Sequence, residues 1–377
     1  MNAPVPRLIR ANDLLPNEPR IRNAAVQQEL TEKHLLPALH ELEIFLLTVR
    51  LQIDSELHQR QPVKLGKPYP LGQCLEIALT VERRLREIKE TSLPPQAHAG
   101  LRVFRAFLRD GGEFRLIWGD LRRQYFQNAF QLGTLYVDVA NDTVVPSKPK
   151  VEILPFHKAD IVPMEDFLHF ATIAGRYWHD RVYPNHVLPS LAPYCPLIHV
   201  GKSGRVQIHD SSRYMLALTR TAAFTPSEQV LSEASMPHEL FDWLRTALQE
   251  APLTLPRSPE EGRQLALQRC GEYRRKRWHQ NPRTDQKVAE TVLKLNRRLA
   301  RQAHFQQRKD TAMSSIRIDN IEYDLNTLSA EANAQLQSVQ FVDQELARLQ
   351  AQIAALQTAR NAYVNALKAA LPAQGKR

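Results

Sequence analysis

Residues 134–155 read TLYVDVANDTVVPSKPKVEILP, a stretch that predicts β-structure in a chain otherwise rich in helical patterns. Apolar side chains recur at every second position over residues 135–139, and two more apolar runs follow. This period of two is typical of a strand with one buried face. Asn141 and Asp142 favour turns and separate the first two runs, so we expect a hairpin here.

Helical patterns dominate the N-terminal side of this stretch. Apolar residues recur at helical spacing over residues 23–56, and Pro37 should kink this helix or divide it in two. Prolines and glycines delimit two more predicted helices, over about 71–91 and 95–109. The helices before residue 94 predict a helical N-terminal region, residues 1–93, and the helix over 95–109 begins the next domain.

A small mixed domain is predicted around residues 134–155. Its further elements are three helices over residues 114–133, 164–183 and 237–249, and a second hairpin formed by residues 197–200 and 206–209. Together these elements predict an α+β middle domain over residues 94–255. The predicted fold class of the whole chain is therefore α+β and helix-rich.

The positive charge of the protein is concentrated in one segment. Residues 256–310 contain fifteen Lys and Arg against six Asp and Glu, so they carry +9 of the net charge of +10. The helix predicted over residues 284–309 has an apolar face formed by Val288, Val292, Leu295 and Leu299, whereas Arg297, Arg298 and Arg301 lie largely on other faces. We interpret residues 256–312 as a basic helical connector that could meet nucleic acid or another acidic surface.

The last segment, residues 313–377, has the pattern of a hairpin followed by a long helix. Small and apolar residues alternate at steps of three and four, as in a coiled coil, at Val339, Val342, Leu346, Leu349, Ile353, Leu356, Arg360, Tyr363, Leu367 and Ala370. Such a narrow stripe predicts an interface with another helix. Arg360 interrupts it, either to pair with a carboxylate such as Asp343 or Glu345 of a neighbouring helix, or to reach solvent if the helix folds back on this chain.

This segment carries a resemblance to a known family. Residues 316–329 read IRIDNIEYDLNTLS and residues 341–363 read FVDQELARLQAQIAALQTARNAY. At these residues the chain resembles a family of small uncharacterised bacterial proteins that occur as free-standing polypeptides. Asn320 stands where the family's turn has glycine, a change that a left-handed asparagine tolerates. The resemblance implies a small oligomerising module fused to a larger body, and it implies no chemistry; residues 1–310 resemble no family.

Histidines are concentrated in the middle domain. Six of the thirteen fall between residues 157 and 209, and the candidates for a metal or acid/base site are His157, His179, Asp180, His199 and His209. No HxH, HxD or HExxH spacing accompanies them, and histidines on half-buried elements usually make structural hydrogen bonds. The sequence does not identify a cofactor.

A basic aromatic run is the candidate contact for an anionic partner. It consists of Tyr273, Arg274, Arg275, Lys276, Arg277 and Trp278, followed by His279. Stacking groups among cations are typical of proteins that hold single-stranded nucleic acid, although a charged run on a helix is more often a solvated face. An acidic protein or lipid head groups are alternative partners.

The remaining composition bounds the class of protein. The length of 377 residues suits two or three domains, and the 43% of hydrophobic residues is ordinary for a globular chain. Three widely spaced cysteines predict reduced thiols, and no apolar run predicts a signal peptide or a transmembrane segment. The sequence therefore favours a cytoplasmic bacterial adaptor that engages a partner, or itself, through the C-terminal helix. The alternatives are an enzyme with a site in residues 157–210 and a nucleic-acid-binding protein.

Overall fold

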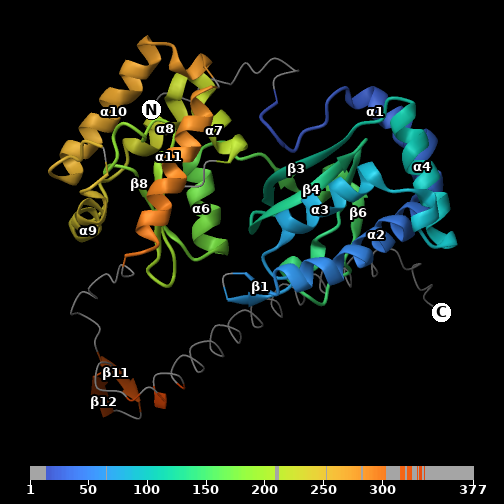
Figure 1. Ribbon diagram of the computed structural model, residues 1–377, viewed down its shortest axis with the longest axis horizontal. Coiled ribbons are helices and arrows are strands. Elements are labelled where there is room, and N and C mark those ends of the chain that lie inside the picture. The colour runs from blue at the N-terminus through green and yellow to red at the C-terminus, as the bar shows by residue number, and fades with distance from the viewer. Residues whose placement is uncertain are drawn as a thin grey trace, which may run out of the picture. The chain divides into compact units, whose positions relative to one another are not determined.

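Figure 1 shows the computed structural model, which describes residues 14–302 except positions 65, 209–211, 252 and 282. Beyond residue 302 it describes 315–318, 321–324, 329, 331, 332 and 335. The density of contacts divides the chain into two units, residues 1–306 and residues 307–377. The described part is rich in helix and contains several sheets, which confirms the predicted α+β class.

The predicted effect of Pro37 is confirmed. Helix α1 (Ala24–Leu30) runs into a single π turn, a short 3-10 turn over Leu36–Ala38 contains the proline, and α2 (Leu39–Arg60) follows. Proline has no backbone N–H and its ring crowds the preceding turn, so a regular α-helix cannot continue through it. The next two predicted helices are also present, as α3 (Cys74–Glu87) and α4 (His98–Arg109).

A five-stranded antiparallel sheet follows these helices, in the order β6-β5-β4-β3-β7. Its strands are β3 (Phe114–Leu121), β4 (Tyr125–Leu132), β5 (Leu135–Asp138), β6 (Glu152–Pro155) and β7 (Ile161–Val162). The helix predicted over residues 114–133 is therefore wrong. Every residue of β4 is buried, and a strand covered on both faces loses the alternation that identifies strands in sequence.

The hairpin predicted around Asn141 and Asp142 is wrong in its second strand, because Val144 and Val145 lie outside any strand and β5 pairs with the third apolar run instead. Strands β5 and β6 pair with Leu135 opposite Pro155, but a 3-10 turn, Asn141–Thr143, begins the connection between them. The core beneath this sheet contains side chains of α2, α3 and α4 together with Phe130 and Val137. This single core includes residues from both sides of the predicted boundary between 93 and 94.

A second core surrounds a three-stranded sheet in the order β10-β9-β8. Its strands are β8 (Arg181–Pro184), β9 (Leu197–Val200) and β10 (Val206–Ile208). The pairing of β9 with β10 confirms the second predicted hairpin as far as Ile208. The helix predicted over residues 164–183 is shorter than expected, because α6 (Phe167–Tyr177) ends before β8 begins.

Five helices complete this part of the fold: α7 (Arg213–Arg220), α8 (Thr225–Leu231), α9 (His238–Leu248), α10 (Pro259–Arg275) and α11 (Thr284–Leu299). Cys270 of α10 and Val292 of α11 belong to the same core as Ile198 of β9 and Phe241 of α9. The described part of the basic segment is therefore packed into a globular core, which differs from the connector interpretation.

Beyond residue 306 the described elements are few. Strands β11 (Ser315–Ile318) and β12 (Ile321–Asp324) pair antiparallel, with Ile318 opposite Ile321, where the sequence predicts a tight hairpin. The predicted interface residues of the heptad helix lie outside the described residues; they are Val342, Leu346, Leu349, Ile353, Leu356, Arg360, Tyr363 and Leu367. Among the residues that the structure describes, no helix combines the length and apolarity needed to span a membrane.

Candidate anion-binding site

Helix α11 separates an apolar face from a cationic one. Its buried side chains are the four that the sequence predicts, Val288, Val292, Leu295 and Leu299. Four cations follow one another at helical spacing: Lys294, and then Arg297, Arg298 and Arg301 at three, four and seven positions after it. They therefore lie along one side of the helix and its C-terminal turn. The helix is fixed by its apolar face and presents its cations outward.

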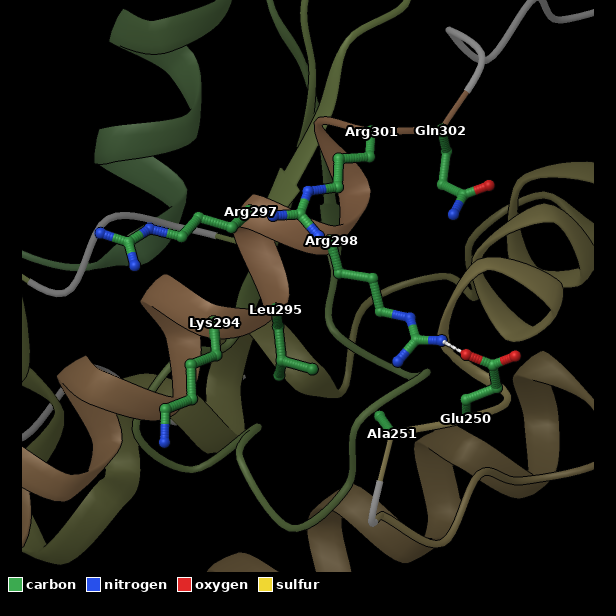
Figure 2. Close-up of a pocket in the computed structure, with 8 residues that line it drawn as sticks. All are labelled: Glu250, Ala251, Lys294, Leu295, Arg297, Arg298, Arg301 and Gln302. Carbon is green, nitrogen blue, oxygen red and sulfur yellow. Dashed lines mark hydrogen bonds and ion pairs between the residues drawn. The ribbon is translucent and has the colours of Figure 1, made fainter.

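A cleft of about 510 Å³ lies along this cationic side, between α11 and the segment that follows α9 (Figure 2). Its lining residues are Glu250, Ala251, Lys294, Leu295, Arg297, Arg298, Arg301 and Gln302. Four of these eight residues are cationic, one is anionic and none is aromatic. The cleft therefore favours an anion, and these eight residues provide no ring on which a base could stack.

The described residues only partly neutralise the charges in the cleft. Arg298 forms an ion pair with Glu250, and its Nε also donates a hydrogen bond to the carbonyl oxygen of Ala247 at 3.1 Å. In Figure 2, Lys294 and Arg297 extend away from Glu250. These two residues and Arg301 form no ion pair with any other described residue of the chain. Neighbouring like charges on a helix repel, so a bound anion would relieve this repulsion.

The basic aromatic run is less accessible than its sequence predicts. Tyr273 is only 7% exposed, and its hydroxyl donates a hydrogen bond to the carbonyl oxygen of Ser190. Trp278 is 36% exposed, but one side of its ring packs on Tyr273 and the Nζ of Lys276 lies 5.2 Å from the ring centre. Tyr273 therefore belongs to the core and cannot stack on a nucleobase.

The cations of this run are also partly used by the fold. Arg274 donates a hydrogen bond from Nε to the carbonyl oxygen of Ala223 and forms an ion pair with Glu228. Lys276 pairs with Glu272 one turn earlier. Only Arg275 and Arg277 lack an ion-pair partner among the described residues. The stronger cationic feature of the segment is therefore the cleft of α11.

The histidine candidates do not assemble into one site. His157 and His179 are exposed, and His209 lies outside the described residues. Only His199 and Asp180 are brought together: the Nδ1 of buried His199 lies 3.1 Å from an oxygen of Asp180. Within the described ranges, no group of three or more His, Cys, Asp or Glu side chains has the geometry of a metal site.

A second histidine–carboxylate pair was not predicted. The Nε2 of His169 lies 3.0 Å from Oδ2 of the fully buried Asp120, and its Nδ1 is 3.4 Å from the backbone N–H of Glu165. Both ring nitrogens are thus engaged, which is the geometry of a structural histidine. Asp120 and His169 are 49 positions apart in the sequence, which explains why no local pattern reveals the pair.

Comparison with known proteins adds no functional assignment. The chain matches no protein family, and no curated protein or solved structure shows significant similarity to it. The resemblance of residues 313–371 to a small bacterial family stays a prediction. The candidate site is therefore argued from its own geometry.

Proposed function

We propose that this protein is a non-catalytic adaptor that holds the phosphate backbone of a nucleic acid in the cleft of α11. The observation that carries the proposal is the row of three cations, Lys294, Arg297 and Arg301, for which the described residues supply no carboxylate. A nucleic acid supplies a row of negative charges, and release of its counterions adds to the affinity.

Two features suit a nucleic acid as the partner. Three of the four cations are arginines, whose planar guanidinium groups bind phosphate oxygens in pairs. The net charge of +10 also attracts a polyanion over a long range. Because none of the described residues that line the cleft is aromatic, we expect recognition through the phosphate backbone, independent of base sequence.

The proposal is tested by fluorescence anisotropy with a labelled single-stranded oligonucleotide. The double variant Lys294→Glu with Arg297→Glu should weaken binding by roughly tenfold or more. It should also make the negative slope of log affinity against log salt concentration shallower by about two, because two phosphate contacts are lost. Lys89→Glu with Lys158→Glu is the matched control, because it changes the net charge equally at exposed sites elsewhere. Equal losses in both variants would contradict the proposal, and equally strong binding of poly-glutamate would favour an acidic protein.

The adaptor role also requires a second contact, which we assign to the heptad helix of residues 339–370. Support comes from the narrow apolar stripe in the sequence, since these residues lie outside the described part. Light scattering should show a multimer for the full chain and a smaller mass for Leu349→Lys with Leu356→Lys. The same mass for both proteins would count against self-association, and a pull-down with the same pair of proteins then tests for a different partner.

A further inference from the structure

Arg298 is the one cation of the cleft that is already held in place. Its Nε donates to the carbonyl oxygen of Ala247, in the last turn of α9, which orients the guanidinium group. One of its terminal nitrogens, Nη2, then meets the carboxylate of Glu250. Figure 2 shows this contact at one side of the cleft. The anchoring bond and the ion pair thus use different nitrogens of the same side chain.

Glu250 occupies the position that a ligand anion would take. A carboxylate and a phosphate bind the same outer edge of a guanidinium group, so the two compete for Arg298. Among the described residues that line the cleft, this carboxylate is the only negative group. Its side chain is 77% exposed, whereas that of Arg298 is 31% exposed, so Glu250 can turn into water while Arg298 stays anchored.

We propose that Glu250 is an internal competitor that lowers the affinity of the cleft until a polyanion displaces it from Arg298. This inference rests on the proposed binding of nucleic acid by the same cleft. Before binding, Glu250 neutralises the charge of Arg298, so three cations of the cleft are available to a ligand. After displacement of Glu250, Arg298 becomes the fourth cation that faces the ligand. Exposed ion pairs are weak, so a ligand with several phosphates can displace the carboxylate.

The experiment is a double-mutant cycle in the full-length protein, read by anisotropy with the same labelled oligonucleotide. Glu250→Gln keeps the size of the side chain and removes its charge, and it should tighten binding roughly two- to tenfold. In the Arg298→Met background the same substitution should have little effect, because the competition has already been removed. Glu239→Gln, an exposed position on α9, is the control for the change in net charge.

The outcomes separate this inference from the proposed function. If the wild type binds and Glu250→Gln leaves its affinity unchanged, or tightens it equally with and without Arg298, the competitor role is overturned while the binding function stands. If only Glu250→Gln binds, the competitor role is supported in its strongest form. If neither protein binds, both ideas fail. Circular dichroism checks the fold of each variant, and Glu250→Ala replaces Glu250→Gln if that variant misfolds.

Discussion

Gly262 of helix α10 lies directly against the backbone carbonyl of His186. A Cβ atom at Gly262 would be 2.9 Å from the carbonyl carbon of His186 and closer still to its oxygen. Gly271, later in the same helix, is different, because a Cβ atom there would meet only the Nη1 of Arg275 at 3.7 Å. One helix therefore contains a glycine that packing requires and a glycine that packing does not require.

Alanine substitutions at these two glycines should change stability in opposite directions. Gly262→Ala forces α10 away from the segment of His186, and overpacking of this kind costs roughly 1–3 kcal/mol. Gly271→Ala should stabilise the protein by up to about 1 kcal/mol, because alanine loses less backbone entropy in a helix. Urea unfolding of both variants measures the difference in stability. A destabilised Gly271→Ala protein would contradict the expectation that a Cβ atom fits at Gly271.

Arg50 of α2 is a buried cation whose loss should be costly. Its side chain is fully buried, with Nη2 3.2 Å from oxygens of both Asp54 and Asp142, and Lys150 also contacts Asp142. Arg50→Met leaves the nearly buried Asp142 with Lys150 as its remaining cation. Removing one partner of a buried pair typically costs about 3–5 kcal/mol. Thermal and urea unfolding should show a loss of this size.

The controls for Arg50 use the same helix and the same carboxylate. Arg60→Met removes an exposed cation 3.7 Å from Glu56, and it should change stability by about 0.5 kcal/mol or less. Adding Asp142→Asn to Arg50→Met should restore part of the lost stability. The second substitution removes the buried negative charge that Arg50 no longer neutralises. Similar effects of Arg50→Met and Arg60→Met would mean that the ion cluster does not stabilise the fold.

Asp138 should make stability depend on pH in the mildly acidic range. Burial raises the pKa of this carboxyl group to about 6, against hydrogen bonds from the backbone of Ala140 and from Gln127 and Tyr136. The folded protein thus binds the proton more tightly than the unfolded chain. The resulting stabilisation is complete below about pH 4 and is lost as the pH rises through 6, and it amounts to roughly 3 kcal/mol at most.

Asp138→Asn tests this dependence because an amide does not titrate in this range. Between pH 4 and pH 7 the wild type loses this stabilisation and the variant does not, so the stability of the variant relative to the wild type should increase with pH. The fold can accept the new amide, since Oε1 of Gln127 is buried and makes no hydrogen bond with other described residues. Urea unfolding at several pH values decides the matter, and a constant difference between the two proteins would be evidence against a raised pKa.

Between α7 and α8, three successive residues adopt left-handed backbone conformations although none of them is glycine. Ala222, Ala223 and Phe224 have φ values of 46°, 53° and 70°. The side chain of Ala222 is exposed, so Ala222→Gly removes the left-handed penalty with little loss of packing. We expect a gain of about 0.5–1 kcal/mol in stability after the entropy of glycine is subtracted. Ala289→Gly, inside α11, should instead cost about 1 kcal/mol, and a loss in both variants would contradict the expectation.

Helices were predictable where their periodicity was local. The apolar spacing of α2, α3, α4, α9 and α11 and the break at Pro37 follow from steps of three and four residues within single elements. The same local rule predicted that Arg297, Arg298 and Arg301 would lie off the apolar face of α11. The pairing of β9 with β10 was equally local, because a short glycine-containing turn joins the two strands.

Tertiary structure decided what depended on residues far apart in the sequence. Burial of β4 on both faces removed its alternation, so residues 114–133 looked helical. The burial of Tyr273 and the pairing of Asp120 with His169 required the packed core. Sequence alone thus determined the charge, the class of fold and the cationic stripe of α11, since these depend on composition and on periodicity within one element. Only packing decided that Glu250 meets Arg298 and that a cleft forms between them, because that contact joins side chains 48 residues apart.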